Sequence, residues 1–341
     1  MSHRPRRIAV LLAVGLTVAA GVAPDPTPRA AASPVKGDFS GPVDIGGRSL
    51  YLECRGQGSP TVILEAGANA RSDVWSRDGV RPAGERMMVQ PAVAGFTRVC
   101  AYDRPGTLGE VNPDLEPDGP DFHPSRSDPV PQPRTTRELT TDLHALLTAA
   151  DIPGPYVLAA HSAGGLVARL YASTHPDDVA GMVLVDTTNE NIWHHFQGAL
   201  TPAQYRAFEA STLDNAELLA AYPEAERLWT APLADTPSVS QVREARQDRP
   251  IRPMPVVVLA HGIPFTAPIA GWPTDEMESI MLDSQRDLVT LVPDARLMIA
   301  AQSGHNIHQD QPELVVDAIA QVVTAVRDPR TWFAAAAPPG R

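Results

Sequence analysis

Short apolar runs alternate with longer amphipathic segments from residue 43 onward. This alternation predicts strands joined by crossover helices, the organisation of an α/β protein with a mostly parallel sheet. Several of the short runs are apolar throughout, which is typical of parallel strands covered on both faces. The predicted strands are Ser49–Cys54, Thr61–Glu65, Thr97–Tyr102, Tyr156–Ala159, Ala180–Val185, Pro255–Leu259 and Arg296–Ala300.

Three amphipathic segments predict helices that flank the sheet. Thr135 and Glu138 have the spacing of a capping box at the start of the first segment, and Pro176 ends the second. The third begins around Asp310 and carries apolar residues at helical spacing. The predicted helices are Thr135–Ala150, Ala163–Thr174 and a final helix from Asp310 to Val326.

Two stretches depart from this alternation. Residues 107–134 are crowded with Pro, Asp and Gly, which predicts a long surface loop. Residues 187–250 contain no convincing strand and indicate a helical insertion between two strands of the sheet. Its helices are expected near Pro202–Ala210, Asn215–Leu219 and Glu224–Trp229.

The same patterns divide the chain into segments. Residues 43–186 and 251–327 are expected to form the core, which the insertion 187–250 interrupts. Residues 33–42 are expected to be a linker, and the Ala/Pro-rich residues 328–341 a flexible tail.

The first 32 residues have the pattern of a signal peptide. Three arginines among residues 4–7 precede an apolar run from Ile8 to Ala23, which is too short to span a bilayer comfortably. Prolines and small residues follow, so we expect cleavage and a secreted or cell-envelope location. Cleavage after Ala23 and cleavage near residues 30–32 both remain open. The alternative is an uncleaved membrane anchor.

Composition narrows the range of partners. The chain of 341 residues is 43% hydrophobic and carries a formal net charge of -12. This charge disfavours nucleic acid and anionic membrane surfaces as partners, because both attract positively charged proteins. We therefore expect a small-molecule substrate, no nucleic acid, and no stable membrane partner after signal removal. Cys54 and Cys100 are compatible either with a disulfide in an exported protein or with buried free thiols.

The strongest local signal surrounds Ser162. An apolar strand ending at Ala159 leads into Ala160-His161-Ser162-Ala163-Gly164, and a helix follows directly. A nucleophilic serine held in a sharp strand-to-helix turn needs very small residues two positions before and after it, and Ala160 and Gly164 meet this demand. The backbone N–H of Ala163, at the start of the helix, is a candidate donor to an oxyanion.

A nucleophilic serine needs a base, and His305 is the best placed of the ten histidines. It follows the last predicted strand, and the carboxyl ends of parallel strands share one edge of a sheet. His308 is the rival, although it lies closer to the next helix. His161 must point away from its neighbour Ser162, so its expected role is structural. We find no group of His, Cys and Asp with metal-ligand spacing.

A carboxylate that orients the base is expected at Asp186. This residue ends the strand before the insertion, again at the carboxyl edge of the sheet. The loop that follows the next strand offers no acid close by. The alternatives are acids further along the chain, at Asp275, Glu276, Asp283 and Asp287.

These motifs resemble the α/β-hydrolase fold superfamily over roughly residues 43–327. Glu65-Ala66-Gly67-Ala68-Asn69 stands where that family has its oxyanion loop, and Ala101-Tyr102-Asp103-Arg104-Pro105-Gly106 is similar to its turn after the fourth strand. Ala66 replaces the usual histidine of the loop. The resemblance implies an eight-stranded, mostly parallel sheet flanked by helices, with residues 187–250 as a helical cap.

The resemblance also implies roles that the residues alone leave open. The second oxyanion donor would be the backbone N–H of Ala68. The family's strand order places the second and fourth strands side by side, which would bring Cys54 and Cys100 together as a disulfide. Aromatic residues of the cap, among them Trp193, could either contact an apolar acyl group or form the cap's own core.

The implied activity is acyl transfer to Ser162, without a cofactor or metal. Carboxylic ester hydrolysis is the leading expectation. Amide, lactone or carbon–carbon bond hydrolysis and a cofactor-free peroxidase activity use the same triad, so they remain alternatives. A noncatalytic exported binding protein is a further alternative, but such a protein would be expected to lose Ser162, His305 or the small residues of the turn.

Overall fold

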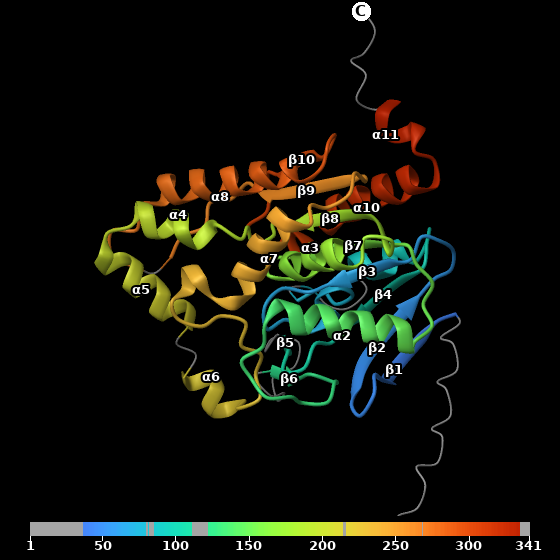
Figure 1. The fold of residues 1–341 in the computed structure, drawn as a ribbon, viewed down its shortest axis with the longest axis horizontal. Helices are drawn as coiled ribbons and strands as arrows, with labels where there is room; N and C mark the ends of the chain where they lie inside the picture. Colours follow the sequence, from blue (N-terminus) through green and yellow to red (C-terminus); the bar gives the residue numbers. More distant parts are fainter. Residues whose placement is uncertain are drawn as a thin grey trace, which may run out of the picture. The chain divides into compact units, whose positions relative to one another are not determined.

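A computed structural model describes residues 37–79, 81, 85–110, 122–213, 216–267 and 269–334. The predicted signal peptide, residues 1–32, lies outside the described residues. The main strands are β1 (Phe39–Asp44), β2 (Ser49–Arg55), β3 (Val62–Glu65), β4 (Val99–Tyr102), β7 (Tyr156–His161), β8 (Val179–Val185), β9 (Val256–His261) and β10 (Arg296–Ala300). They form one eight-stranded sheet in the order β1-β2-β4-β3-β7-β8-β9-β10 (Figure 1).

The sheet is mostly parallel, as predicted. Strands β3, β4 and β7 to β10 run parallel, whereas β2 pairs antiparallel with both β1 and β4. The seven strands predicted from the sequence are confirmed to within two residues at either end. The fold class is therefore confirmed.

Helices cover both faces of the sheet because strand side chains alternate between them. In β7, Leu158 faces a core shared with α2 (Thr136–Ala149) and α3 (Gly164–Thr174). Its neighbour Val157 faces the core of α1 (Val89–Val93) and α10 (Pro312–Arg327). The predicted capping box of Thr135 and Glu138 is present at the start of α2. The site at the strand ends therefore rests on a sheet buried on both sides.

Strand β1 corrects the expected linker. Residues 39–42 belong to this strand rather than to a connecting segment. Gly41 and Pro42 obscure the pattern, but β1 is an edge strand with one neighbour, and an edge strand tolerates proline.

The described residues of the segment 107–134 are more ordered than the plain surface loop that the composition of this segment predicts. Its described residues include β5 (Leu108–Glu110) and β6 (Phe122–Pro124), which pair antiparallel. Arg126 then places its guanidinium 2.7 Å from a carboxylate oxygen of the fully buried Asp103. A buried charge thus holds this segment against the turn after β4.

The insertion between β8 and β9 is helical, as expected, but its helices differ in part from the prediction. Two of the expected helices are confirmed, and the one expected at Glu224–Trp229 is wrong. Ala225, Glu226 and Leu228 are buried there in non-helical backbone, so contacts with the core override the local helical preference. The helices are α4 (Ile192–Ala199), α5 (Pro202–Leu213), α6 (Ala216–Ala221), the short 3₁₀ helix η2 (Leu233–Asp235) and α7 (Pro237–Asp248).

The cap helices share an apolar core with α8 (Thr274–Leu288), which follows β9. Phe196 of α4 and Phe208 of α5 pack edge to face, with ring centroids 5.3 Å apart. Met277 of α8 is fully buried in the same cluster. The aromatic residues therefore form the cap's own core, and some of them, including Trp193, also line a cavity.

Elements after β10 complete the fold. They are α9 (Ile307–Asp310), α10 and α11 (Arg330–Ala334), while short 3₁₀ helices η1 (Ser72–Trp75) and η3 (Val289–Leu291) lie earlier in the chain. Helix α11 corrects the expected flexible tail at residues 330–334, because Trp332 is buried and stacks on the guanidinium of Arg296. Residues 335–341 lie outside the described residues.

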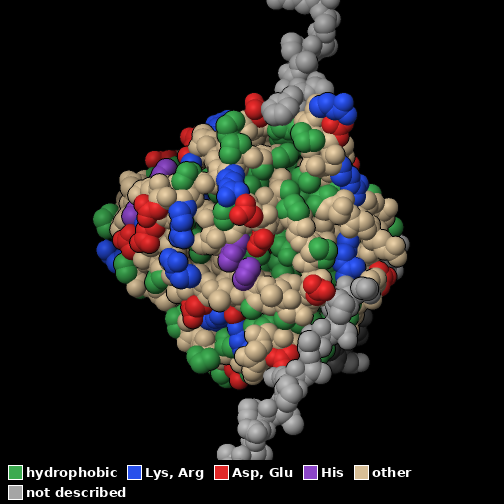
Figure 2. All heavy atoms as spheres, turned by 45° about the vertical axis from the view of Figure 1, so that its right-hand side comes forward, with side chains coloured by type: hydrophobic (Ala, Val, Ile, Leu, Met, Phe, Trp, Pro, Cys, Tyr) green, Lys and Arg blue, Asp and Glu red, His purple; other side chains and the backbone are tan. Residues whose placement is uncertain are grey.

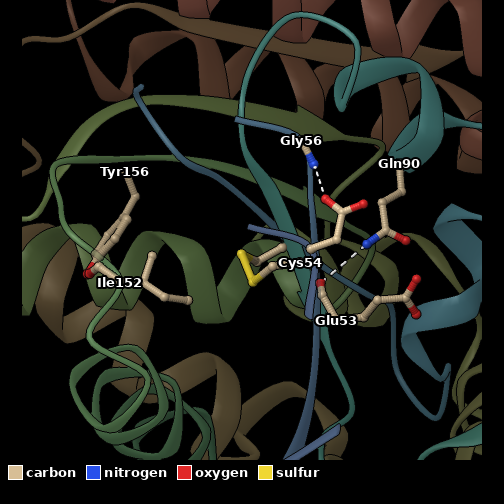
Figure 3. Close-up of a disulfide and its surroundings, with 8 residues drawn as sticks. Glu53, Cys54, Gly56, Gln90, Ile152 and Tyr156 are labelled. Atoms are coloured by element: carbon tan, nitrogen blue, oxygen red, sulfur yellow. Dashed lines mark hydrogen bonds between the residues drawn. A yellow bond between two sulfur atoms is a disulfide. The ribbon is translucent and has the colours of Figure 1, made fainter. Parts of the chain in front are cut away.

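Cys54 and Cys100 form a disulfide, which confirms the pairing that the resemblance implied. The two cysteines face each other across the antiparallel pair β2–β4. Nearby, the Gln90 side chain donates a hydrogen bond to the carbonyl of Glu53, next to the bridge (Figure 3). The bridge ties the antiparallel edge of the sheet to its parallel part.

The surface drawn in Figure 2 mixes acidic, basic and apolar side chains over the same face. On that face, the net charge of -12 therefore does not form one continuous acidic patch. Among the described residues, none of the helices is both long and apolar enough to cross a membrane.

Candidate active site

A sharp turn between β7 and α3 presents Ser162. Its φ of 50° lies in the left-handed region, which residues other than glycine adopt only under constraint. A Cβ on Gly164 would lie 2.5 Å from the carbonyl oxygen of Ala66, and one on Gly165 would lie 2.3 Å from the Cβ of Thr187. The small residues around Ser162 are thus required by close contacts with the neighbouring loops.

Three predicted site residues meet at the carboxyl edge of the sheet. Ser162 follows β7, Asp186 follows β8, and His305 lies in the loop after β10. The Nε2 atom of His305 is 2.9 Å from Ser162 Oγ, and its Nδ1 atom is 2.6 Å from Asp186 Oδ2. This geometry lets the imidazole accept a proton from the hydroxyl while its Nδ1–H donates to the carboxylate.

Asp186 is held in its ionised form. Burial alone would raise the pKa of this carboxyl, but hydrogen bonds from His261 and His305 outweigh burial and lower the pKa below its usual value. The carboxylate is buried, whereas the side chain of His305 is 43% exposed. A substrate can therefore reach the imidazole, while the acid behind it is shielded from water.

The other acidic candidates lie on α8, where two bind other partners and two are exposed. Asp287 accepts a hydrogen bond from Arg246, with 2.5 Å between Oδ2 and Nη1, and Asp283 pairs with Arg286 at 2.7 Å. The two acids in the first turn of α8 are exposed, and these are Asp275 and Glu276. Among the described residues, Asp186 is the only carboxylate within hydrogen-bond distance of the His305 ring.

The histidines around His305 have structural roles. His308, the rival base, is buried against Trp75 with ring centroids 4.9 Å apart, and burial lowers its pKa to about 3. His161 donates from Nε2 to the carbonyl oxygen of His305 over 3.0 Å. Burial also holds the pKa of His161 well below its usual value. Both neighbours are therefore neutral, and His161 fixes the backbone of His305.

Two backbone N–H groups beside Ser162 are free to bind an oxyanion. Within the part of the chain that the structure describes, no acceptor lies within hydrogen-bond range of the N–H of Ala68 or Ala163. Ala163 is buried, and a buried N–H without a partner is costly unless a ligand satisfies it. These are the two N–H groups that the sequence and the resemblance suggested.

Two cavities open from Ser162 and His305. The first, of about 240 Å³, reaches toward the cap helices and α8, and the second, of about 320 Å³, lies on the side of η1 and α9. The side chains that line the first are mainly apolar and include Ile192, Trp193, Phe196, Phe208, Phe265 and Met281. Those lining the second are mainly polar and include Asp73, Arg77, Asn306, Gln309 and Asp310.

Comparison with known proteins assigns the family. The model of the alpha/beta hydrolase family matches residues 62–318, about three quarters of the chain. The chain belongs to the alpha/beta hydrolase family. An AB hydrolase superfamily protein of Gibberella zeae is 23% identical to it over 326 residues, which cover 82% of this chain and 92% of that protein.

Other similarities are more limited. A probable transporter of Hormonema carpetanum, efuK, is 29% identical over 156 residues, or 44% of this hydrolase. The match spans only 19% of that relative. A bromoperoxidase from Bacillus anthracis has a TM-score of 0.55 at 16% identity, covering 84% of the hydrolase and 100% of the bromoperoxidase. At this identity the likeness shows the fold alone.

The hydrolase carries a buried ion network beneath residues 65–69, the candidate oxyanion loop, and the sequence does not predict this network. Arg104, in the turn after β4, binds Glu65 at the start of the loop and Glu226 from the cap segment, whose Oε1 lies 2.7 Å from Nε. Its Nη2 donates to the carbonyl of Gly67 over 2.5 Å, and Asn69 N–H donates to Glu226 over 2.9 Å.

This network fixes the direction of the Ala68 N–H. In a trans peptide the C=O and the following N–H point to opposite sides. Because Arg104 holds the Gly67 carbonyl, the N–H of Ala68 points away from Arg104, and Ala68 lines the polar cavity beside Ser162. The position of one candidate oxyanion donor thus depends on Arg104, which is 37 residues from Gly67 in the sequence.

Asp186 has a second imidazole partner, which the sequence also does not predict. His261, the last residue of β9, places Nδ1 2.7 Å from Asp186 Oδ1. Its Nε2 lies 3.2 Å from Glu278 Oε2 on α8. The parallel pairing of β8 with β9 could have indicated that the two strand ends meet, although not that the side chains face each other.

One group in the described part of the hydrolase has metal-ligand side chains close together. Potential ligand atoms of His144, His175 and Asp178 lie within 4.8 Å of one another. However, the two imidazole rings stack at 4.0 Å with planes 6° apart, so their in-plane lone pairs do not converge on one ion. His144 Nδ1 instead lies 3.2 Å from the hydroxyl of Tyr171. This geometry fits a packed polar cluster better than a metal site.

Proposed function

We propose that this protein hydrolyses carboxylic esters through an acyl-enzyme on Ser162. His305 takes the hydroxyl proton as Ser162 Oγ attacks the carbonyl carbon, and Asp186 stabilises the imidazolium that forms. The N–H groups of Ala68 and Ala163 bind the oxyanion. When the carbon–oxygen bond breaks, His305 returns the proton to the leaving alcohol. Water then attacks the acyl-enzyme by the same steps and releases the acid.

The observation that carries this proposal is the contact chain from Ser162 through His305 to Asp186. Both hydrogen bonds, 2.9 Å and 2.6 Å, are within normal range and need no rearrangement. The unpaired N–H groups beside the hydroxyl supply the electrostatic part of the chemistry. Removing one such donor typically reduces turnover by about 10²–10³.

The two cavities support a division of the substrate. An apolar acyl group suits the cavity beneath the cap, where Trp193 and Phe196 contribute to the wall. A water molecule takes about 30 Å³ of liquid volume, so the cavity of about 240 Å³ has room for roughly eight groups of that size. The polar cavity on the other side suits the leaving alcohol. We therefore expect short to medium acyl chains to be preferred.

Active-site labelling tests the proposed nucleophile. Wild-type protein should react covalently with a fluorophosphonate, and Ser162→Ala should not. Ser173→Ala is a matched control, because Ser173 lies on the far part of α3 and leaves the turn intact. Labelling that persists in Ser162→Ala would exclude Ser162 as the nucleophile, and no labelling of the wild type would favour a noncatalytic binding protein.

A substrate panel tests the bond that is cleaved. Aryl esters with acyl chains of two to sixteen carbons should show a maximum of kcat/KM at about four to eight carbons, because longer chains exceed the cavity. Anilides and lactones with the same acyl groups complete the panel. Faster turnover of an anilide or lactone than of every ester would replace ester hydrolysis with that activity.

We also propose that the enzyme is exported. The arginine-led apolar segment at residues 1–32 and the Cys54–Cys100 disulfide support this location, since disulfides persist in oxidising compartments. Expression of the full chain in a bacterial host, followed by fractionation, tests it. Mature protein that retains residues 1–32 and stays with the membrane fraction would instead indicate an anchor.

A further inference from the structure

His261 lies between two carboxylates and is shielded from water. Its side chain is 3% exposed, and the nearest polar atoms to its two ring nitrogens are Asp186 Oδ1 and Glu278 Oε2. An ionised carboxylate only accepts hydrogen bonds, and a neutral imidazole has only one N–H. Both contacts can form together only when both nitrogens carry protons. This geometry therefore indicates that His261 is protonated on both nitrogens, as an imidazolium.

This cation extends the line of site residues beyond Asp186. From the nucleophile outward, the order is Ser162, His305, Asp186, His261 and Glu278, each joined to the next by a hydrogen bond. Asp186 thus lies between two imidazoles, one on each carboxylate oxygen. Its negative charge is shared between the base that reacts and a histidine that has no contact with Ser162.

We propose that His261 is a positioning residue whose positive charge, acting through Asp186, sets the pH at which His305 becomes an active base. This inference rests on the proposed serine hydrolase mechanism. A cation on the far side of Asp186 offsets part of the carboxylate's pull on a proton at His305. The enzyme should therefore keep its activity further into the acidic range than it would with Asp186 alone behind His305.

In the described residues, His261 and His305 are the two side chains that form hydrogen bonds with Asp186. Asp186 and Glu278 face His261 directly. Around His305, the further titratable neighbours are His161 and His308, and burial keeps both neutral by lowering their pKa values. The charged side chains of Asp73, Arg77 and Asp310 line the polar cavity that His305 also lines, but none of them contacts Asp186. The acids at the start of α8, Asp275 and Glu276, are exposed to solvent. The charge at position 261 is thus the one that balances Asp186.

Protonation of His261 at neutral pH agrees with its surroundings. Burial alone would lower the pKa of His261, but the hydrogen bond and charge of Asp186, with the charge of Glu278, outweigh burial and raise it to about 9. His261 therefore keeps its proton over the pH range in which a catalytic histidine normally titrates.

Orientation and charge can be separated by mutation. Asp186 Oδ1 also accepts the backbone N–H of His261 over 3.2 Å, and this contact survives a change of side chain. In His261→Asn, the amide nitrogen can occupy the place of Nδ1 and donate to Asp186, while the positive charge is lost. Glu278→Gln keeps the histidine and removes the carboxylate that stabilises its cation. His144→Asn, in the surface cluster on α2, is the matched control.

The test is the pH dependence of kcat/KM on a short-chain aryl ester, together with the pH dependence of fluorophosphonate labelling. Both report the protonation of the base in the free enzyme. The acidic limb is the part of the profile in which kcat/KM falls as the pH is lowered. In His261→Asn, we expect this limb to move up by about one pH unit, which is about a tenfold loss of kcat/KM at pH 5.5. The loss of kcat/KM in His261→Asn should be clearly smaller at pH 8.5 than at pH 5.5, because the base is unprotonated there in both proteins. Glu278→Gln should shift the limb less, in the same direction, and His144→Asn should not shift it.

An unchanged acidic limb in both His261→Asn and Glu278→Gln would overturn the proposal and leave His261 a structural residue. Equal losses at every pH would do the same. Nitrogen-15 NMR of the histidine rings gives a readout that does not need activity. We expect His261 to carry two ring protons at pH 7, and a neutral ring would also overturn the proposal.

Failure of the proposed function gives a different pattern. If the wild type neither hydrolyses the panel nor reacts with the fluorophosphonate, the serine hydrolase assignment fails. The NMR titration of His305 in wild type and His261→Asn then still decides whether the two imidazoles are coupled, since it should move by about one pH unit between them.

Discussion

Two buried ion chains flank Ser162, and both place a cation between two carboxylates. His261 lies between Asp186 and Glu278, and Arg104 lies between Glu65 and Glu226. In each chain, one carboxylate belongs to the central sheet region. The other carboxylate lies outside the sheet. Glu278 is on α8, and Glu226 is in the segment before η2.

The two chains differ in the kind of cation. A guanidinium keeps its charge across the usable pH range, and the neighbouring acids raise the pKa of Arg104 further despite its burial. An imidazolium releases its proton within that range. The chain that holds the oxyanion loop is thus built on a permanent charge, whereas the chain behind the base can respond to pH. This difference can be tested from both sides.

The largest expected effect comes from removing the permanent cation. Arg104→Ala leaves Glu65 and Glu226 buried without their partner, which should lower the free energy of unfolding by about 3–5 kcal/mol. Urea unfolding at pH 7 measures it. Arg137→Ala, at an exposed position on α2, should change stability by less than about 0.5 kcal/mol. A loss below about 1 kcal/mol at Arg104 would mean that the network is unimportant for folding.

The disulfide gives the next effect, and it should not alter the pH response. Cys54 and Cys100 close a loop over a sequence separation of 46 residues, so Cys54→Ser with Cys100→Ser should cost about 2–4 kcal/mol of stability. Because the bridge contacts neither ion chain, the acidic limb of kcat/KM should remain in place. A shifted limb in this double variant would show that the His261 chain depends on strand placement rather than on charge.

Loss of the His261 proton should lower the free energy of unfolding at high pH. The folded pKa of His261, about 9, is above the usual value of 6.5. The stabilisation that this raised pKa provides is complete below pH 6.5 and is lost as the pH rises through 9. Between pH 7 and pH 10 we expect the free energy of unfolding to fall by about 2 kcal/mol more in wild type than in His261→Asn. Equal pH dependence in the two proteins would contradict a buried imidazolium.

The smallest stability effect should come with a change in activity that is independent of pH. Glu226→Gln keeps a hydrogen-bond acceptor for Asn69 but weakens the hold on Arg104, at a cost of about 1 kcal/mol. A less firmly held oxyanion loop should lower kcat about tenfold at every pH, with KM little changed. Glu224→Gln, exposed two residues earlier, is the control. A pH-dependent loss in Glu226→Gln would remove the distinction between the two chains.

The residues that the sequence predicted have local signals. Ser162 lies among small residues between a strand and a helix, and Asp186 and His305 follow apolar strands. Parallel strands deliver their carboxyl ends to one edge, so pattern alone was enough to bring these residues together. The strand order and the Cys54–Cys100 pairing could be predicted only from the resemblance to a known fold. The hydrophobic pattern of a single strand does not show which strands lie beside it.

The ion chains have no such signal. Glu226 is 122 residues from Arg104, within a stretch whose local preference is helical but whose backbone is non-helical in the folded protein. His261 has an apolar strand before it, like any residue at a strand end. Whether its ring turns toward Asp186 depends on side-chain packing against α8. Tertiary structure determines contacts of this kind, so the pattern of a single sequence does not predict them.

The bridge between β2 and β4 also has a mechanical consequence. Strand β1 forms one edge of the sheet, and the antiparallel pair β1–β2 joins the rest through β4. An edge hairpin held only by hydrogen bonds can peel away as a unit and expose its backbone to proteases. The disulfide between Cys54 and Cys100 keeps β2 covalently attached to β4 even when the hydrogen bonds of the hairpin open. For the exported protein proposed above, the covalent link would therefore make this edge of the sheet resistant to extracellular proteases.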